Sequence, residues 1–352
     1  MKAIAVTPGK AGSLRLVQSD PPRPRAGELL VRLIEAGICG TDLEIAEGLY
    51  GEGPNGSDFL ILGHESLGVV ETAGSDRFAP GDLVVATVRR PCPSCSNCRA
   101  GVSDMCETGR FTERGILGGH GFMAEFYAES PEFLVKVPAL QRSFAVLLEP
   151  MSVVEKGIEQ IFRIQQRMEW QPGSALVLGA GPIGLLATLL LRIRGISTTT
   201  FATRPVGGLK SRLVSEAGAR YRSRSEVDLN RWPDRFDLIV EATGSADVAF
   251  DAINLLKANG VLCLTSVTGG AFEKRIEAAR MNFDIVLGNK LVFGTVNANR
   301  RYFEKGVLDF AEIETRWPGI LDRMITRRIP FSSFREAFAK DPEGVKTVLV
   351  NS

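Results

Sequence analysis

The sequence predicts a mixed α/β protein with a doubly wound parallel sheet, preceded by a region that is mostly β structure. In residues 174–296, strand-like apolar runs alternate with helical patterns, as expected for a parallel sheet covered by helices. Residues 1–90 hold short apolar runs interrupted by Pro and Gly, as in PPRPRAGE, EGPNGSD and FAPGD, which indicates short strands and turns. A glycine-rich turn at 179–184 links a strand pattern to a helix pattern and supports the parallel sheet.

Composition and charge are those of an ordinary globular protein. The chain has 352 residues, 44% hydrophobic and 24% charged, a length that suits about two domains. The formal net charge of +1 gives no reason to expect a nucleic acid or an anionic membrane as a partner. The start, MKAIAVTPGK, lacks the apolar core of a secretory signal and is read as a first strand. We therefore expect a cytoplasmic protein in a reducing compartment, where clustered cysteines usually bind metal or do catalysis.

Four of the six cysteines lie in one short polar stretch, RRPCPSCSNCRAGVSDMCE, at Cys92, Cys95, Cys98 and Cys106. Their C-x2-C-x2-C-x7-C spacing can direct four thiolates at one centre, which satisfies tetrahedral zinc with no open position, as in structural sites. An iron–sulfur cluster is the alternative. The lobe, at about 89–110, has too few apolar residues for its own core, so metal binding is expected to fold it.

The stretch SALVLGAGPIGLLATLLLRIRG, residues 174–195, predicts a dinucleotide-binding turn. Its uncharged part is long enough for a membrane helix, but three glycines and a proline argue against one. The expected strand Ala175–Leu178 is followed by Gly179, Ala180, Gly181, Pro182, Ile183 and Gly184, and then by a helix. Gly179 permits the tight turn, Gly181 lets the backbone approach a pyrophosphate, and Gly184 lets helix and strand pack closely. The helix N-terminus would donate N–H groups to the phosphates.

The residues after the second expected strand favour NADP over NAD. This strand, Thr198–Ala202, is followed by Thr203 and Arg204, and no Asp or Glu occurs between the glycine motif and Glu216. An NAD site normally has an acidic residue there for the ribose hydroxyl. A hydroxyl and a guanidinium suit a 2′-phosphate instead, and Lys210 and Arg212 lie close behind. An ordinary solvated basic face is the alternative, and NAD stays possible as a second cofactor.

Further strands of the parallel sheet are expected at Phe236–Val240, Gly260–Thr265 and Lys290–Val296. Thr243 and Gly244 follow the first of these, at the strand end where such sheets bind ligands. Cys263 falls inside an apolar strand and is read as a core residue. The C-terminal REAFAKDPEGVKTVLV predicts a helix, a turn and a closing strand, to which no chemistry is assigned.

A second group of metal-ligating residue types lies in the N-terminal region. Cys39 occurs in AGICGTDLEI, and His64 and Glu65 occur in ILGHESLG. A lone histidine is usually structural, but a cysteine, a histidine and a carboxylate with one open position can form a catalytic zinc site. Sequence separation alone does not decide whether these side chains meet.

The combined pattern resembles the zinc-dependent medium-chain dehydrogenase/reductase superfamily over essentially the whole chain. The motifs that carry this resemblance are GICGTD around Cys39, GHE at His64 and Glu65, PGD at 80–82, the four-cysteine lobe, LLEP at Glu149, and GAGPIG. Within the superfamily, the closest resemblance is to the glucose dehydrogenase branch known best from archaea. Its carriers are VRRPCPSCSNCRAGVSDMCETG, GILGGHGFMAEFY, LLEPMSVVEKGIE and GTVNANRRYF.

The resemblance implies a GroES-like, β-rich catalytic domain at 1–153 and 299–352 and a Rossmann domain at 154–298, with the active site in the cleft. It implies that the four clustered cysteines hold a structural zinc and that Cys39 and His64 bind a catalytic zinc. Glu65 would be a direct or water-linked ligand, and Glu149 a further ligand or a sugar-binding group. Thr41 would lie by the reacting hydroxyl. Glu113 and Asn297 would contact the sugar, with Asn297 also in the cofactor site.

The implied reaction transfers a hydride from C1 of an aldose, D-glucose first, to NADP and yields the lactone. The metal would lower the pKa of the anomeric hydroxyl. Relatives are commonly homo-oligomers, so a tetramer is expected before a dimer. One alternative is another zinc enzyme of the superfamily, acting on a polyol or another alcohol as sorbitol and threonine dehydrogenases do. A nucleotide-binding relative without zinc is the other.

The sequence departs from many alcohol dehydrogenases of the superfamily at the position of Glu44, where those enzymes have a proton-relaying histidine. The proton route is therefore open between Glu44, Glu65 and water. His120, the only other histidine, is read as structural or as a neighbour of the site. Asp42 and Glu125 are read as structural carboxylates that hold backbone N–H groups.

Overall fold

The computed structural model describes residues 1–72, 75–268 and 273–351, and the chain divides into two compact units. The first unit comprises Met1–Ser152, Asn297–Ala311 and Leu321–Ser352, and the second comprises Val153–Val296 and Glu312–Ile320. The division falls within two long helices, α3 (Leu148–Gln165) and α8 (Arg300–Arg316).

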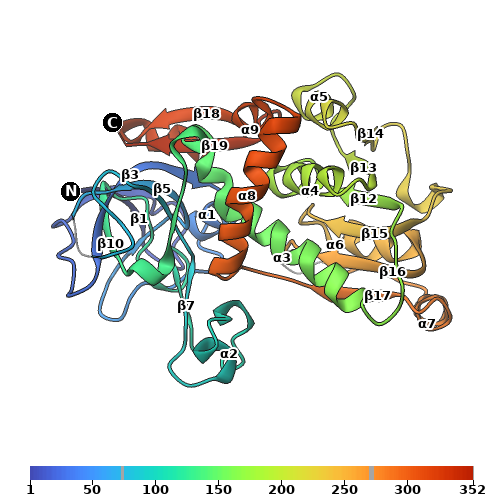
Figure 1. The fold of residues 1–352 in the computed structure, drawn as a ribbon, viewed down its shortest axis with the longest axis horizontal. Coiled ribbons are helices and arrows are strands. Elements are labelled where there is room, and N and C mark those ends of the chain that lie inside the picture. Colours follow the sequence, from blue (N-terminus) through green and yellow to red (C-terminus); the bar gives the residue numbers. More distant parts are fainter. Residues whose placement is uncertain (73–74, 269–272, 352) are drawn as a thin grey trace. The chain divides into compact units, whose positions relative to one another are not determined.

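The second unit is built on a parallel sheet in the order β14-β13-β12-β15-β16-β17, which Figure 1 shows in succession. The first strand of this unit, β12, lies in the middle of this order, as in doubly wound dinucleotide-binding folds. The strands are β12 (Ser174–Leu178), β13 (Ser197–Ala202), β14 (Arg220–Ser223), β15 (Phe236–Glu241), β16 (Leu256–Leu264) and β17 (Leu291–Gly294). The connecting helices are α4 (Pro182–Ile193), α5 (Leu209–Glu216), α6 (Ala246–Asp251) and α7 (Ala278–Leu287). The predicted parallel sheet is confirmed.

The strand bounds differ from the prediction where local signals mislead. β16 begins at Leu256, before the predicted Gly260, because the turn-like KANG segment continues the strand with Asn259 at a positive φ of 62°. β17 is shorter than the predicted Lys290–Val296. β14, with the sequence RYRS, has too little apolar character to be predicted, yet it pairs with β13 along its length.

The apolar run after the glycine motif forms a buried helix. α4 spans only 12 residues, and its side chains from Leu185 to Leu191 are buried. A helix of that length rises about 18 Å, less than the hydrocarbon thickness of a bilayer. Across the three described ranges, the structure has no helix that is both long and apolar enough to cross a membrane.

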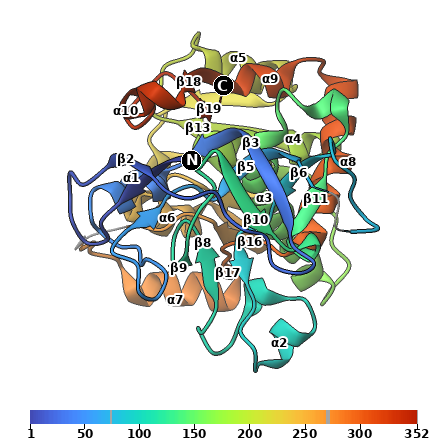
Figure 2. The same cartoon turned by 90° about the vertical axis from the view of Figure 1, so that its left-hand side faces the viewer.

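The first unit contains one seven-stranded sheet and two three-stranded sheets. A seven-stranded sheet has the order β11-β6-β5-β3-β19-β18, with β10 also paired to β3, and a three-stranded sheet has the order β2-β1-β4. Their strands are β1 (Lys2–Val6), β2 (Arg15–Gln18), β3 (Leu29–Ile38), β4 (Leu60–Ile61), β5 (Glu65–Val70), β6 (Leu83–Ala86), β10 (Phe126–Glu129), β11 (Leu134–Lys136), β18 (Ile325–Pro330) and β19 (Lys346–Val350). The C-terminal strand β19 lies between β3 and β18 (Figure 2), so the end of the chain completes a sheet that the N-terminal region builds.

Short elements complete the first unit. The helices are α1 (Gly40–Ala46), α2 (Ser96–Arg99), α9 (Ile320–Met324), which begins at the unit boundary, and α10 (Phe334–Ala337). The small sheet consists of β7 (Arg89–Arg90), β8 (Thr112–Arg114) and β9 (Gly118–Gly119). The lobe with α2 follows β7 in Figure 1. Its buried cluster is made of cysteines, Cys92, Cys95 and Cys98 with Cys106 packed against them, which agrees with the expected shortage of apolar side chains.

Candidate active site

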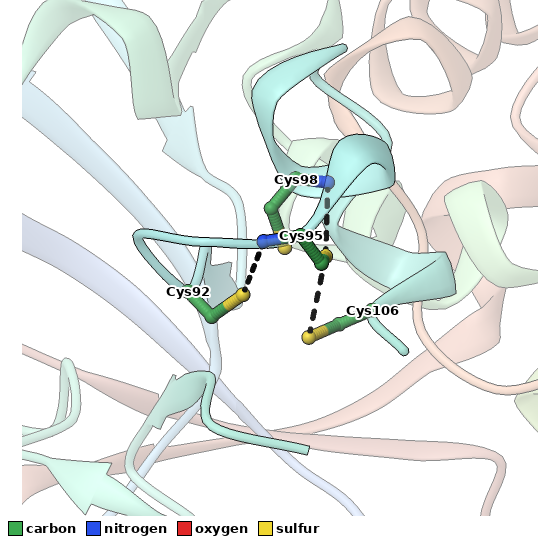
Figure 3. Close-up of side chains that lie close together, drawn as sticks. All are labelled: Cys92, Cys95, Cys98 and Cys106. Carbon is green, nitrogen blue, oxygen red and sulfur yellow. Dashed lines mark hydrogen bonds between the residues drawn. The ribbon is translucent and has the colours of Figure 1, made fainter. Parts of the chain in front are cut away.

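The four clustered cysteines converge in the lobe around α2 (Figure 3). Their Sγ atoms all lie within 4.8 Å of one another, and all four are free thiols. The backbone N–H of Cys95 donates to Cys92 Sγ at 3.4 Å, and that of Cys98 donates to Cys95 Sγ at 3.4 Å. Such hydrogen bonds stabilise the thiolate form, which is the form that binds metal.

The thiol chemistry of this lobe fits a tetrahedral metal. Zn–S bonds of about 2.3 Å place neighbouring sulfurs about 3.8 Å apart, and Cys95 Sγ lies 4.0 Å from Cys106 Sγ. Hydrogen bonds from Thr108 and from backbone N–H groups lower the pKa of Cys92 to about 5. Burial raises the pKa of Cys98 to about 12. Burial thus opposes ionisation of Cys98, and a bound cation would favour it.

Strand pairing brings Cys39, His64 and Glu65 together. Cys39 follows β3 and begins α1, while His64 and Glu65 stand at the start of β5. β3 and β5 are antiparallel neighbours with Gly37 opposite Glu65. Cys39 Sγ lies 3.1 Å from His64 Nε2, and one ligand atom of each of the three residues lies within 4.8 Å of the others. The sulfur, nitrogen and oxygen donors that sequence alone could not join are thus one group.

Asp42 holds two members of this group. Its Oδ2 accepts the backbone N–H of Cys39 at 3.0 Å, as expected for a structural carboxylate. Its Oδ1 also lies 3.5 Å from His64 Nδ1, which leaves His64 Nε2 facing Cys39. Burial alone would lower the pKa of His64, but the charges of Cys39 and Asp42 raise it well above its usual value. A carboxylate behind the imidazole is the usual support of a histidine metal ligand.

Several buried polar atoms here have no hydrogen-bond partner among the described residues. They are Glu65 Oε2, His64 Nδ1 and Asp42 Oδ1. Each of them nevertheless lies against an oppositely charged group, since Glu65 Oε2 contacts Lys346 Nζ and His64 Nδ1 lies 3.5 Å from Asp42 Oδ1. The fit to a metal therefore rests on the donor types, a thiol, an imidazole and a carboxylate within 4.8 Å of one another. Three protein donors with one open position are the donor set of catalytic zinc.

Lys346 brings the C-terminal strand, to which the sequence analysis assigned no chemistry, into contact with this group. Its Nζ contacts Glu65 Oε2, and the two side chains are 1% and 2% exposed. β19 pairs with β3, which in turn pairs with β5, so this pairing places the Lys346 ammonium group beside Glu65. A Cβ on Gly37 would overlap the Glu65 carboxylate. The missing side chain at Gly37 therefore makes room for the pair.

Thr41 and Tyr50 lie beside Cys39. The Thr41 backbone N–H donates to Cys39 Sγ at 3.2 Å, and the Thr41 side chain is near enough to the Tyr50 phenol to lower its pKa. Burial raises the pKa of Tyr50 to about 12, although its side chain still reaches solvent. The charge of Glu44 also acts on Tyr50. Sequence reasoning missed Tyr50, whose only signal is an aromatic residue in the glycine-rich loop after α1.

Glu149 is buried in the first turn of α3. It is not among the three residues whose ligand atoms group within 4.8 Å. Burial raises the pKa of Glu149 to about 7, with His64 opposing the shift and Glu65 adding to it. Its carboxylate is therefore within electrostatic reach of the metal-binding group without belonging to it.

Glu113 and Asn297 meet although 184 positions separate them. Asn297 Nδ2 donates to Glu113 Oε1 at 2.7 Å, and Asn297 has a left-handed φ of 60°. Arg89 also binds Glu113, a contact that sequence analysis did not identify. His120 accepts the Ile61 N–H on Nδ1 and stacks on Phe59, and Glu125 accepts the Lys2 N–H. The last two residues have the structural contacts expected of them.

The glycine motif forms the expected turn between β12 and α4. Gly179 has a φ of 106°, and a Cβ on Gly184 would overlap the Gly179 carbonyl oxygen. A Cβ on Gly181 would meet nothing within 4 Å, so the backbone there is open to a close ligand. Pro182 and Ile183 form the first turn of α4.

The second and fourth loops of the sheet carry the remaining cofactor candidates. Thr203 and Arg204 directly follow β13, and Arg224, which sequence analysis missed, donates its backbone N–H to Ala202 O at the same edge. The Arg212 guanidinium donates a hydrogen bond to the Gly207 carbonyl oxygen. At the end of β15, Glu241 Oε1 accepts the N–H and hydroxyl of Thr243. The Gly244 N–H donates to Ser266.

Comparison with known proteins agrees with this arrangement. Residues 25–139 match the family described as the alcohol dehydrogenase GroES-like domain, and residues 142–350 match the glucose dehydrogenase C-terminus. Glucose 1-dehydrogenase of Methanocella arvoryzae is 52% identical over 99% of both chains, and that of Thermoproteus tenax is 43% identical over 99% of both.

A solved structure of Haloferax mediterranei glucose dehydrogenase, in complex with NADP, Zn and gluconolactone, matches with a TM-score of 0.93 and 33% identity, covering 100% of this chain and 99% of that one. The two family matches together span most of the chain, and the second alone spans more than half of it. The chain therefore belongs to the zinc-dependent medium-chain dehydrogenase/reductase superfamily, in its glucose dehydrogenase family.

Proposed function

We propose that this protein is a zinc-dependent oxidoreductase that transfers a hydride from C1 of D-glucose to NADP and produces the lactone. The observation that carries the proposal is the buried group of Cys39, His64 and Glu65 in a chain of the glucose dehydrogenase family. The solved relative bound to NADP, Zn and gluconolactone supports the choice of substrate and cofactor.

Two sets of residues would hold metal. Cys92, Cys95, Cys98 and Cys106 would bind a structural zinc with no open position, and Cys39, His64 and Glu65 would bind a catalytic zinc with one. Zinc at the second set supplies Lewis acidity that lowers the pKa of a bound hydroxyl. Asp42 keeps the His64 imidazole oriented, and Lys346 balances the charge of Glu65.

Thr41 and Tyr50 offer a route for the proton. Thr41 donates its backbone N–H to Cys39 Sγ, and its hydroxyl would take the proton of the reacting sugar hydroxyl. Tyr50, whose pKa responds to Thr41 and which is 40% exposed, would pass that proton on to solvent. This route replaces the histidine relay that is absent at Glu44. Glu113 and Asn297 supply polar groups for the other sugar hydroxyls.

The parallel sheet would hold the dinucleotide. The turn from Gly179 to Gly184 and the N-terminus of α4 receive the pyrophosphate. Thr203 and Arg204 receive the 2′-phosphate, with Arg224 beside them, and Glu241 fixes the loop of Thr243 and Gly244. NADP held by these residues would supply the acceptor for the hydride.

The test is the initial rate of NADP reduction with D-glucose by protein loaded with zinc. Fast reduction, with a higher kcat/KM for NADP than for NAD, is the expected result. Sorbitol and L-threonine are assayed in parallel as substrates of the alternative superfamily enzymes. Turnover of either alcohol without turnover of glucose would overturn the sugar assignment.

We also propose that the protein is a homo-oligomer, a tetramer before a dimer. β17 is an edge strand of the parallel sheet, and the adjacent α7 exposes apolar side chains, with Phe283, Val286 and Leu287 each more than 60% exposed. An unpaired edge beside an exposed apolar patch is typical of an association surface. Light scattering tests the state, and Val292→Lys in β17 is expected to weaken the association.

A further inference from the structure

Arg89 connects the four-cysteine lobe to Glu113. It lies in β7 directly opposite Glu113 in β8, so the two side chains project from the same face of the small sheet. Arg89 Nε and Nη2 both donate to Glu113 Oε1, at 3.0 and 2.9 Å. The guanidinium carbon lies 3.7 Å from the centre of the Phe111 ring, and the Arg89 side chain is only 7% exposed. The Arg89 guanidinium group is thus held on its face by Phe111 and at its edge by Glu113.

Glu113 uses one carboxylate oxygen for protein contacts. Oε1 accepts from Arg89 and from Asn297 Nδ2, whereas no residue in the described parts of the chain donates to Oε2. The Glu113 side chain remains 12% exposed. A carboxylate has room for about four hydrogen bonds. Its plane is therefore fixed by three N–H groups while Oε2 stays available to a hydroxyl group.

Asp104 ties this pair to the lobe. It lies in the short 3-10 helix Ser103–Met105, between Cys98 and Cys106. Its carbonyl oxygen accepts from Arg89 Nη1 at 3.3 Å, and its Oδ1 accepts from Asn299 Nδ2 at 2.9 Å. Asn299 is two residues beyond Asn297, so a single acidic residue of the lobe contacts the supports of both Glu113 and Asn297.

We propose that Arg89, Asp104 and Asn299 are positioning residues for the sugar and that the four-cysteine lobe thereby sets sugar affinity. The inference rests on the proposed function, in which Glu113 and Asn297 bind the substrate. Metal in the lobe holds the backbone on both sides of Asp104, Asp104 holds Arg89 and Asn299, and these hold the two sugar contacts.

Lobe stability alone does not explain the arrangement. A buried ion pair contributes little net stability compared with well-packed apolar residues. The lobe nevertheless buries Arg89 and Asp104 against Asn297 and Asn299 of a distant segment, and one oxygen of Glu113 stays open. Fixed donors and one free acceptor are what a specific polar binding site requires.

The experiment compares Arg89→Lys with Arg90→Lys in zinc-loaded protein. Lysine keeps the charge of Arg89 but loses the fork that donates twice to Glu113. Arg90 is the matched control, since it is the other residue of β7 and pairs with Glu129 instead. For Arg89→Lys the KM for glucose is expected to rise about tenfold or more, from the loss of hydrogen bonds to a charged group. The KM for NADP, the zinc content and the melting temperature are expected to stay near wild type.

A second variant, Asn299→Ser, keeps the inference testable if Arg89→Lys does not fold. Serine keeps an oxygen for the Arg301 N–H at the start of α8 but removes the donor to Asp104. Its KM for glucose is expected to rise about threefold to tenfold, as for one lost hydrogen bond to a charged group. Calorimetric binding of D-glucose to the zinc-loaded protein without NADP must weaken in parallel for both variants.

The outcomes separate this inference from the proposed function. A wild type that does not turn over glucose overturns the proposed function and the inference with it. An active wild type with an unchanged glucose KM and affinity in both variants overturns the inference alone. An equal rise in the Arg90→Lys control also overturns it, because the effect would then come from general loosening of β7.

Discussion

Replacing Lys346 by methionine tests the buried ion pair at the metal site. Methionine keeps a long unbranched side chain and removes the ammonium group that faces Glu65. Both partners are almost fully buried, so Glu65 would be left as a buried carboxylate without its counter-charge. The change thus isolates electrostatics from packing.

The magnitude follows from the burial of the pair. Removing one partner of a buried ion pair costs about 3–5 kcal/mol, because the remaining charge stays desolvated. An exposed pair contributes only about 0–1 kcal/mol. Lys136 supplies the matched control, since it pairs with Asp82 at 2.7 Å but is 59% exposed. We therefore expect a large loss for Lys346→Met and almost none for Lys136→Met.

The assay is urea unfolding followed by circular dichroism, with and without zinc. The midpoint of metal-free Lys346→Met is expected to fall well below that of wild type, while Lys136→Met unfolds with the wild type. Zinc is expected to recover part of the loss, because a bound cation gives Glu65 a new counter-charge. Equal midpoints for the two lysine variants, or a loss that zinc leaves untouched, would refute the reasoning.

Three further predictions concern the cofactor, the thiols and pH. Arg204→Ala is expected to raise the KM for NADP about tenfold to hundredfold and to leave the KM for NAD unchanged. Arg212→Ala serves as the control, because the Arg212 guanidinium donates to the Gly207 carbonyl oxygen. An equal effect of Arg204→Ala on both cofactors would contradict the 2′-phosphate role. Cys95→Ser is expected to lower the bound zinc from two ions per chain to one, whereas Cys263→Ser keeps both, as metal analysis will show. Burial alone would raise the pKa of Asp237, but hydrogen bonds from Ser174 and Lys257 lower it. A carboxyl with a lowered folded pKa stabilises the protein above its unfolded value of 3.8 and loses that effect as pH falls further. Asp237→Asn is therefore expected to lower the melting temperature at neutral pH, with a difference that shrinks as the pH falls below that value.

Local signals in the sequence were enough for the parallel sheet and for both metal-ligating sets of residue types. The glycine motif predicted its turn because only glycine tolerates the φ of 106° at Gly179 and the close carbonyl at Gly184. The four cysteines were predicted to converge because short spacing alone keeps them near one another. In β14 the same approach failed, since RYRS becomes a strand through pairing with β13 and not through its own apolar pattern.

Side chains that meet only through the fold were beyond the reach of the sequence. Lys346 reaches Glu65 because β19 closes the sheet against β3, and Asn297 reaches Glu113 across 184 positions. By itself the sequence determined the residue types for zinc and for a dinucleotide, since spacing and turn chemistry are local properties, and the sugar contacts followed only from the family resemblance. Only the tertiary structure decided which charges neutralise one another and which oxygens stay open, because burial and pairing depend on strands and loops that are distant in the chain.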